Sequence, residues 1–417
     1  MKILSVYFHG GEGEPINIGR LAAHQHKCHL ELSSEFVASG MNLSPFMLKP
    51  TTELQEAQPT PFNGLHGVFN DSLPDGWGLI LMDRAFKQHG IDTASITPVD
   101  RLAYMGDRAM GALSYKPDDG KQFFEDADDE LDLDALATES VRLYEGEIEE
   151  VMDCLAINGT PSGGARPKVL LGLNGNKVIA GAGDLPDGFG HWLAKFPTGT
   201  SADKKSEGAI EFIYSNMARQ AGVDFSKTRL VPGTEDNDYF VTNRFDRDDG
   251  NKRIHVHSLA GLINADFRVP DCDYETLIKV CSHLTKSHEE TSQLFRRMLF
   301  NIMSGNRDDH SKNFAFLMDA KGVWKNTPAY DVTYNLGMNG EHTMDVSGVG
   351  KNITLDHIMP IAKLASVSKK DVKHMIDEVS SALSQWDQEA KNYNIPKTQL
   401  TDISKHIQGQ RKLLVPA

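Results

Sequence analysis

The segment GNRDDHSKNFAFL, residues 305–317, brings together polar side chains whose types and spacing suit phosphoryl transfer. Asp308 and Asn313 lie five positions apart, and protein kinases use an aspartate and an asparagine at this spacing in their catalytic loop. The aspartate accepts a proton from the attacking hydroxyl, and the asparagine oxygen helps to hold magnesium. Asp309 does not have this spacing, so the pattern favours Asp308 as the catalytic base.

The chain after Asn313 leads to another acidic residue. FAFLM and VWKN, joined by the turn DAKG, predict a β-hairpin that ends near Asp331 in the stretch PAYD. In kinases a hairpin also separates the catalytic loop from a second metal-binding aspartate. A polar loop can carry the first spacing by chance, but here the hairpin and Asp331 follow it in the expected order. The sequence therefore predicts Asn313 and Asp331 as magnesium ligands.

A basic, glycine-bearing loop precedes the most regular part of the sequence. The loop PSGGARPK, residues 161–168, is followed by VLLGL, NGN and KVIAG, which predict a β-hairpin with Asn174-Gly175 as its turn. The loop lacks the Walker pattern G-x-x-x-x-G-K-[ST]. Successive backbone N–H groups near Gly163 and Gly164 can still cradle a phosphate. A plain basic turn is the alternative interpretation.

The next strand and helix supply a lysine and a glutamate. HWLAKFP predicts a strand that carries Lys195, and AIEFIYSNMARQAG, residues 209–222, predicts an amphipathic helix that carries Glu211. In a kinase, a lysine on the third strand holds the nucleotide phosphates and a helix glutamate orients that lysine. The alternatives are a strand-end lysine and a helix-face glutamate, both in solvent. The order of the elements along the chain favours a nucleotide site.

The histidines near these motifs have structural interpretations as well. His310 could be a structural residue or a metal ligand, and no second histidine follows it at metal-site spacing. His255 and His257 alternate along RIHVHSL, which predicts a strand, and we expect both side chains at the surface.

Composition limits the class of protein. The chain has 417 residues, of which 40% are hydrophobic and 24% are charged, as in ordinary globular proteins of two or three domains. The apolar runs are too short to span a bilayer, and the first residues lack the apolar core of a signal peptide. Four cysteines without a CxxC pair predict neither a zinc ribbon nor a disulfide framework, so we expect a cytoplasmic protein. The net charge of −15 argues against nucleic-acid binding by the whole surface.

Periodicity predicts three parts along the chain. The first hundred residues are rich in predicted strands and turns, including a strand over CHLELSSEFV, residues 28–37. The acidic run over residues 125–134 predicts a solvated linker. From residue 274 the pattern is mainly helical, with capping boxes at Ser287 and Ser368. The domain limits expected from these changes are 1–125, 140–245 and 246–417.

Several motifs together resemble HipA-type serine/threonine protein kinase toxins, which belong to toxin–antitoxin systems. These motifs are GGARPK, LAKFP, RFDR, GNRDDHSKN and PAYD, and the stretches FNDSLPDGWG and MGDRAMGALSYKP resemble that family's N-terminal subdomain. The resemblance spans about residues 1 to 400. It implies an α+β, two-lobed protein-kinase-like fold with a β-rich N-terminal subdomain and a mainly helical C-terminal lobe.

The same resemblance implies cofactors and partners. The nucleotide would be ATP with Mg²⁺, and the phosphate would go to a protein hydroxyl, which in some members is on an aminoacyl-tRNA synthetase. Growth inhibition and persistence would follow from that transfer. A small DNA-binding antitoxin of the HipB type is the implied partner, with contact to DNA mainly through the antitoxin complex and no contact with a membrane.

The resemblance also implies roles for individual residues. Asp308 is the catalytic base, Asn313 and Asp331 hold magnesium, and Lys195 contacts the nucleotide phosphates with Glu211 as its ion-pair partner. The nucleotide-binding residues implied in this way are Gly163, Gly164, Ala165, Arg166, Pro167, Lys168, Lys195, Glu211, Asn243, Arg244, Phe245, His310, Lys312, Asn313, Tyr330 and Asp331.

Two positions depart from the family pattern. The family often has an acidic residue just before RFDR, where this chain has Asn243, so the affinity for adenine or its orientation is expected to differ. Pro161 occupies the usual place of an autophosphorylated serine. Its neighbours Ser162 and Thr160 become the candidate autophosphorylation sites, with an ordinary turn serine as the alternative for Ser162.

The leading hypothesis is therefore an active protein kinase that is neutralised by its antitoxin. A kinase-fold module that represses transcription without catalysis is the second hypothesis, and a small-molecule kinase is the third. The presence of Asp308, Asn313, Asp331 and Lys195 together favours an enzyme, because a pseudo-enzyme is expected to lose at least one of them.

Overall fold

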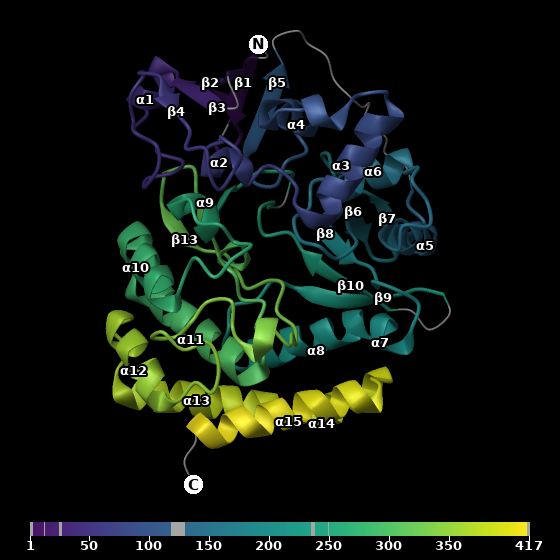
Figure 1. Cartoon of the computed structure of the whole chain (residues 1–417), viewed down its shortest axis with the longest axis vertical. Coiled ribbons are helices and arrows are strands. Elements are labelled where there is room, and N and C mark those ends of the chain that lie inside the picture. The colour runs from purple at the N-terminus through teal and green to yellow at the C-terminus, as the bar shows by residue number, and fades with distance from the viewer. Residues whose placement is uncertain are drawn as a thin grey trace.

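The structure is a computed structural model that describes residues 3–11, 13–24, 27–117, 130–234, 238–248 and 250–414. Three β-sheets divide it into an N-terminal, a middle and a C-terminal unit, and most of the long helices lie in the C-terminal unit (Figure 1). The predicted α+β class is confirmed. The predicted acidic linker falls half outside the described residues, and its last residues lead into a helix that begins at Leu133.

The N-terminal unit is an antiparallel sheet covered by short helices. Its strands are β1 (Ile3–Phe8), β2 (Ile16–His24), β3 (Lys27–Leu32), β4 (Gln55–Glu56) and β5 (Leu113–Pro117), in the spatial order β4-β3-β2-β1-β5. Its helices are α1 (Ser34–Ala38), α2 (Gly67–Asn70), α3 (Gly76–Gln88) and α4 (Pro98–Met105). The strand predicted over residues 28–37 ends at Leu32, because the Ser33 side chain accepts the Phe36 N–H and begins α1.

The middle unit carries the predicted nucleotide-binding elements. Its strands are β6 (Lys168–Asn174), β7 (Lys177–Ala180), β8 (Gly190–Lys195), β9 (Thr228–Pro232) and β10 (Asp238–Asn243), in the order β7-β6-β8-β10-β9. Its helices are α5 (Leu133–Tyr144), α6 (Asp153–Gly159), α7 (Ala202–Lys205) and α8 (Glu207–Gln220). Asn174 pairs with Lys177, so the hairpin turn is Gly175-Asn176, one residue later than predicted. Gly175 has φ of 59°, which glycine adopts without strain.

Helix α8 confirms the predicted amphipathic helix. It packs against β9 and β10 and buries its apolar side, including Ile213 and Met217. Glu211 lies on the same helix and is only 1% exposed. A buried glutamate at this place needs cationic partners, and the structure supplies them at the end of β8.

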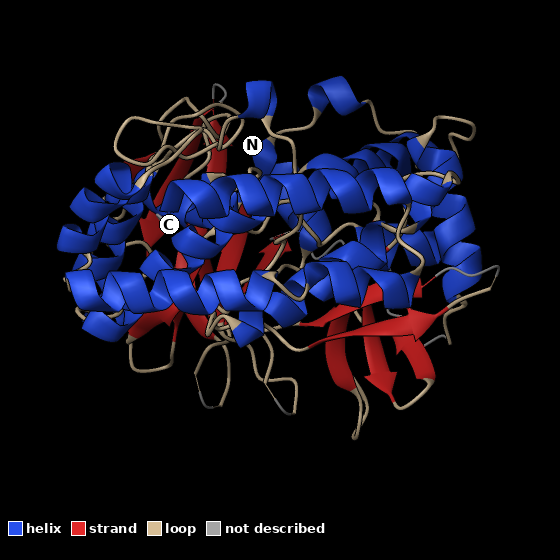
Figure 2. Cartoon of the chain, turned by 90° about the horizontal axis from the view of Figure 1, so that it is seen from below, coloured by secondary structure: helices blue, strands red, loops and turns tan. Residues whose placement is uncertain are grey.

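The C-terminal unit combines a small sheet with a helical bundle. Its strands are β11 (His255–Ser258), β12 (Ala315–Met318) and β13 (Trp324–Asn326), and the predicted hairpin after Asn313 is β12-β13. Its helices are α9 (Leu259–Ile263), α10 (Tyr274–Thr285), α11 (His288–Ser304), α12 (Leu355–Leu364), α13 (Lys369–Leu383), α14 (Trp386–Glu389) and α15 (Lys397–Leu414). Helices α13 and α15 lie side by side at one end of the molecule (Figures 1 and 2). Ser287 and Ser368 are the N-caps of α11 and α13, where their hydroxyls accept the N–H groups of Glu290 and Asp371, which is the N-cap half of the predicted capping boxes.

The prediction that His255 and His257 lie at the surface is wrong. Both side chains are buried, because the N-terminal unit covers strand β11. His257 Nδ1 is 2.6 Å from Asp71 Oδ2, and His257 Nε2 is 2.9 Å from Ser44 Oγ. Burial lowers the pKa of His255 to about 3, so that ring is neutral in the folded protein.

The RFDR motif forms a second contact between the N-terminal unit and the rest of the chain. Asp246 is fully buried and accepts hydrogen bonds from Arg244 Nε at 2.9 Å, from Arg247 Nη1 at 2.8 Å and from the Gly111 N–H at 2.7 Å. Arg247 Nη1 also donates to the Gly111 carbonyl at 2.9 Å. We call Arg244, Asp246 and Arg247 the closed cluster, because it anchors the loop before β5 to the chain after β10.

Two expectations from composition concern the length of apolar helices and the state of the cysteines. No helix in the described part of the chain is long and apolar enough to cross a membrane. All four cysteines, Cys28, Cys154, Cys272 and Cys281, are free thiols.

Candidate active site

The three units meet around a cavity of about 560 Å³, which is within the usual range for small-molecule sites. The predicted site residues that line it are Ser162, Gly163, Gly164, Ala165, Lys168, Lys195, Glu211, Asn243, Arg244, Phe245, Asp308, His310, Lys312, Asn313, Tyr330 and Asp331. Thr160, Arg166 and Pro167 are not part of this lining. Asp71, Asp75 and Met110 of the N-terminal unit also line the cavity, so all three units contribute to it.

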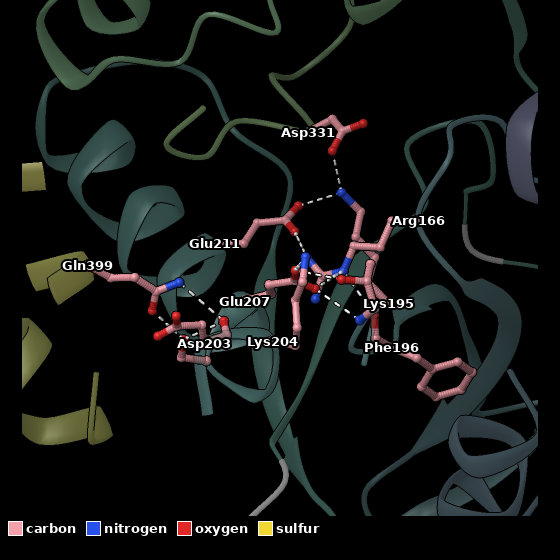
Figure 3. Close-up of polar contacts among 11 residues, drawn as sticks. Arg166, Lys195, Phe196, Asp203, Lys204, Glu207, Glu211, Asp331 and Gln399 are labelled. Atoms are coloured by element: carbon pink, nitrogen blue, oxygen red, sulfur yellow. Dashed lines mark hydrogen bonds and ion pairs between the residues drawn. The ribbon is translucent and has the colours of Figure 1, made fainter. Parts of the chain in front are cut away.

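Lys195 lies at the end of β8 between two carboxylates (Figure 3). Its Nζ is 2.6 Å from Glu211 Oε1 and 2.5 Å from Asp331 Oδ1. The Lys195 side chain is 6% exposed, so the alternative of a lysine and a glutamate in solvent is wrong. One amine therefore joins a strand, a helix and the loop after β13. We call Lys195, Glu211 and Asp331 the open cluster, because it borders the cavity.

Arg166 contacts the other side of Glu211. Arg166 Nη1 is 3.0 Å from Glu211 Oε2, and Arg166 Nε donates to the Phe196 carbonyl at 2.9 Å (Figure 3). Two cations thus share the Glu211 carboxylate, which accounts for its burial. Arg166 lies behind the cavity lining and supports Lys195 through this glutamate.

The adjacent Asp308 and Asp309 have opposite environments. The Asp309 side chain is fully buried, accepts a hydrogen bond from Tyr274 Oη at 2.7 Å and lies 2.8 Å from His342 Nδ1. The Asp308 side chain is 54% exposed and lines the cavity. Asp309 therefore fixes the loop, and Asp308 is the carboxylate that a ligand can reach.

Asn313 and Asp331 present oxygen donors to the same cavity. The Asn313 Nδ2 donates to the Asp308 carbonyl at 2.7 Å, which fixes the direction of the amide. Asp331 has φ of 53°, a left-handed conformation that is strained for a residue with a side chain. Such strain is found most often at ligand sites, where surrounding contacts hold the backbone in place.

Arg297 of α11 supports both loops from beneath, and the sequence reasoning missed it. Its Nη2 donates to the Asn313 carbonyl at 2.6 Å and to the Tyr330 carbonyl at 3.3 Å, and its guanidinium lies 4.3 Å from the Phe314 ring centroid. The residue is 4% exposed. The signal was an arginine within an apolar helical stripe, because a charged residue is rarely buried there without partners.

Lys312 connects the loop of Asp308 and Asn313 to the N-terminal unit. Its Nζ is 2.8 Å from Asp75 Oδ2, and it lies 4.8 Å from the Phe267 ring centroid. The His310 ring packs against the same phenylalanine at 5.6 Å. Within the described ranges, no group of three or more His, Cys, Asp or Glu side chains gathers as a metal site. The contact with Phe267 fits the structural interpretation of His310.

The charged groups of the cavity have shifted pKa values. Burial alone would raise the pKa of Asp331, but Lys195 and Lys168 hold it well below its usual range. Burial would lower the pKa of Lys195, but Asp331 and Glu211 raise it. Burial lowers the pKa of Lys168 to about 8. Partial desolvation of the carboxyl, together with the charges of Asp331 and Asp309, raises the pKa of Asp308, which suits a group that accepts a proton.

Asn243, Arg244 and Phe245, which the resemblance implies as nucleotide-binding residues, lie at the end of β10 and line the cavity. The Asn243 Nδ2 and the Arg244 N–H both donate to the His191 carbonyl at 3.0 Å. Phe245 packs on Tyr330, with ring centroids 5.3 Å apart. The side chain of Arg244 points into the closed cluster, so this segment also serves the attachment of the N-terminal unit.

The two candidate autophosphorylation sites are buried in the loop before β6. Thr160 Oγ1 donates to the Ala156 carbonyl at 2.5 Å, and Ser162 Oγ donates to the Gly159 carbonyl at 2.9 Å. Both residues are at most 1% exposed. The loop would have to open before either hydroxyl could receive a phosphate.

Comparison with known proteins supports the predicted family resemblance and fold. Two family models match the chain, the HipA N-terminal domain over residues 6–116 and the HipA-like C-terminal domain over residues 160–386. HipA of Shewanella oneidensis, solved in complex with HipB and operator DNA, superposes with a TM-score of 0.66 at 15% sequence identity. The alignment covers 98% of this chain and 95% of that one. The predicted kinase-like fold is thereby confirmed.

Relatives of known sequence are described as putative kinases. One from Haemophilus influenzae is 28% identical over 128 residues, which is 28% of this chain and 37% of the relative. Putative kinase Y4dM of Sinorhizobium fredii is 25% identical over 222 residues, which is 49% of this chain and 53% of the relative. This chain thus spans about half the length, or less, of these two relatives.

Proposed function

Because the chain belongs to the HipA family, we propose that it is an ATP- and Mg²⁺-dependent kinase that phosphorylates serine or threonine hydroxyls of a protein. The observation that carries this proposal is the open cluster, where Lys195 binds both Glu211 and Asp331 beside the exposed carboxylate of Asp308. A co-repressor without catalysis would have no use for this arrangement.

Each residue of the site has a role in the proposed transfer. Lys195 and Lys168 bind the phosphates, and Glu211 orients Lys195. Residues 243–245 receive the adenine. Asp308 accepts the proton of the acceptor hydroxyl. The hydroxyl oxygen forms the new bond to the γ-phosphorus, and the bond from the γ-phosphorus to the bridging β-phosphate oxygen breaks. The leaving group is ADP, so atoms and charge balance without a further reactant.

Magnesium fits the donor set of this cavity. Asn313 and Asp331 offer an amide and a carboxylate oxygen, the ligand types that Mg²⁺ prefers. When bound, the metal would neutralise negative charge on the phosphates. Asp331 stays ionised near neutral pH because of its lowered pKa, so it is ready to bind a cation.

The proposed partner is a DNA-binding antitoxin of the HipB type. The solved HipA relative is in complex with HipB and operator DNA. The net charge of −15 argues against DNA binding by the whole surface of this chain, so contact with DNA through the antitoxin is favoured. The substrate would be a cytoplasmic protein, with an aminoacyl-tRNA synthetase as the candidate to test first. The three sheets support domain limits near 1–125, 140–245 and 246–417.

Asp308→Asn tests the proposed reaction. The variant should bind ATP within about threefold of wild type, while transfer of labelled γ-phosphate to lysate proteins falls by about 10²–10⁴-fold, because the base contacts the acceptor. Asp356→Asn, an exposed aspartate in the first turn of α12, is the matched control and should keep full activity. Full transfer by Asp308→Asn would end the kinase assignment. Label that appears only in small molecules would replace the protein substrate by a small one.

A further inference from the structure

The sequence LPDGWG, residues 73–78, lies against the loop that precedes β6. The Trp77 N–H donates to the Gly164 carbonyl at 3.0 Å, and the Trp77 indole N–H donates to the Lys168 carbonyl at 3.1 Å. In return, the Gly164 N–H donates to the Asp75 carboxylate. The start of α3 therefore holds both sides of the loop that is proposed to bind phosphate.

Two glycines of this motif allow the close approach. A Cβ at Gly76 would come within 2.7 Å of Ala165 Cα, and a Cβ at Gly78 would come within 2.4 Å of the Thr160 carbonyl oxygen. Real Cβ atoms do not approach so closely, so any other residue would push the loop away. The pattern of Asp75, two glycines and Trp77 is thus matched to the loop along its length.

Asp75 also reaches the catalytic loop. Its second carboxylate oxygen is 2.8 Å from Lys312 Nζ, and the two side chains are 15% and 14% exposed. Burial would raise the pKa of Asp75, but Lys312 and the Gly164 N–H lower it, so the carboxylate is charged near neutral pH. One carboxylate of the N-terminal unit therefore joins the phosphate loop to the catalytic loop.

We propose that Asp75 is a positioning residue of the nucleotide site, and that it fixes the Gly163-Gly164 backbone and Lys312 in the places where ATP phosphates are bound. The inference rests on the proposed function. A loop with two adjacent glycines loses much conformational entropy when it is ordered, and contacts made before binding lower that cost for the nucleotide. The N-terminal unit is then a part of the active site.

Two other interpretations of Asp75 predict different results. If its carboxylate competed with phosphate for the Gly164 N–H and Lys312, removing it would strengthen ATP binding. If it only stabilised the fold, removing it would weaken binding of ATP and of adenosine together, in step with the loss of stability. Positioning predicts a loss that is confined to ligands with phosphates.

The test compares wild type, Asp75→Ala and Asp75→Asn, with dissociation constants for Mg-ATP and for adenosine from calorimetry. Asp75→Ala should weaken ATP binding by about tenfold or more, as expected for a lost charge-assisted pair, and adenosine binding by less than about twofold. Asp75→Asn should fall between, because its amide oxygen still accepts the Gly164 N–H while the charge facing Lys312 is lost. Asp83→Asn is the matched control, because Asp83 lies on α3, the helix that Asp75 precedes, and pairs with Arg101 at 2.6 Å.

Each outcome decides the inference. Unchanged or tighter ATP binding by Asp75→Ala overturns it, and so does a parallel loss for ATP and adenosine. If Asp75→Ala does not fold, the test uses a double variant that combines Asp75→Asn with Lys312→Met. This double variant should lose no more ATP affinity than Lys312→Met alone. A wild-type protein that binds no ATP would overturn the proposed function together with this inference, whereas normal wild-type binding with an unaffected variant overturns the inference alone.

Discussion

The closed cluster and the open cluster each pair an aspartate with at least one basic side chain. Asp246 of the closed cluster is fully buried and binds Arg244, Arg247 and a backbone N–H. Asp331 of the open cluster binds Lys195, and its side chain is 36% exposed at the cavity. Asp246 attaches the N-terminal unit to the chain after β10, whereas Asp331 lines a cavity that a ligand can enter.

Charge alone does not separate these two roles. Burial would raise the pKa of both carboxyls, yet Arg244 and Arg247 hold Asp246 well below its usual range, and Lys195 and Lys168 do the same for Asp331. A strongly lowered pKa is therefore no sign of a functional site by itself. What marks the open cluster is that its aspartate, Asp331, lines the cavity beside Asp308, whereas Asp246 does not.

Asp246→Ala should show the largest effect on stability. Removing the carboxylate leaves Arg244 and Arg247 buried without their partner, which costs about 3–5 kcal/mol in the free energy of unfolding. Urea denaturation of the wild type and the variant measures this loss. A variant with wild-type stability would show that the closed cluster does not anchor the N-terminal unit.

Asp331→Asn should show the opposite pattern. Its stability should change by less than about 1 kcal/mol, because the side chain is partly in solvent and Glu211 still pairs with Lys195. Phosphate transfer should fall by about 10²–10³-fold, as for the loss of one charge-stabilising group in an active site. Asp331→Asn and Asp246→Ala are compared in the same denaturation and transfer assays. An equal loss of stability in both variants would contradict the different roles assigned to the two clusters.

The predictions from the sequence succeeded where neighbours along the chain determine structure. The hairpin β12-β13, helix α8 and the caps at Ser287 and Ser368 all follow from local pattern. The order of the elements also predicted that Lys195 and Glu211 interact, and the structure places Lys195 Nζ 2.6 Å from Glu211 Oε1. The hairpin turn of the middle unit was misplaced by one residue, because NGN allows two registers.

The failures concern contacts between units that are distant in sequence. His257 was expected at the surface, but it is buried because Asp71 and Ser44 of another unit cover it. Asp75 lies in a stretch that resembles the family's N-terminal subdomain, but the sequence pattern predicts no role for it, because its partner Lys312 is 237 positions away. Such contacts depend on how the units pack, and a local pattern carries no information about that.

The effect of magnesium on stabilisation by ATP should depend on Asp331 of the open cluster. ATP should raise the melting temperature more with Mg²⁺ than with EDTA, because Asn313 and Asp331 are the proposed ligands of the metal that would accompany the phosphates. The difference should disappear in Asp331→Ala and remain in Asp356→Ala. Thermal unfolding with adenosine in place of ATP serves as the ligand control. An unchanged effect of magnesium in Asp331→Ala would remove that residue from the metal site.

The smallest expected effect is a pH dependence of nucleotide affinity, and it concerns Lys168 beside the open cluster. Its pKa of about 8 means that the amine is charged below pH 8 and becomes neutral above it. A charged amine binds phosphate better, so the ATP affinity should fall as pH rises above 8, by at most about tenfold per pH unit. Calorimetry in buffers of different ionisation enthalpy should detect uptake of about one proton per ATP near pH 9. Lys168→Arg keeps the charge and should remove both the slope and the uptake. A slope that persists in this variant would place the titrating group elsewhere.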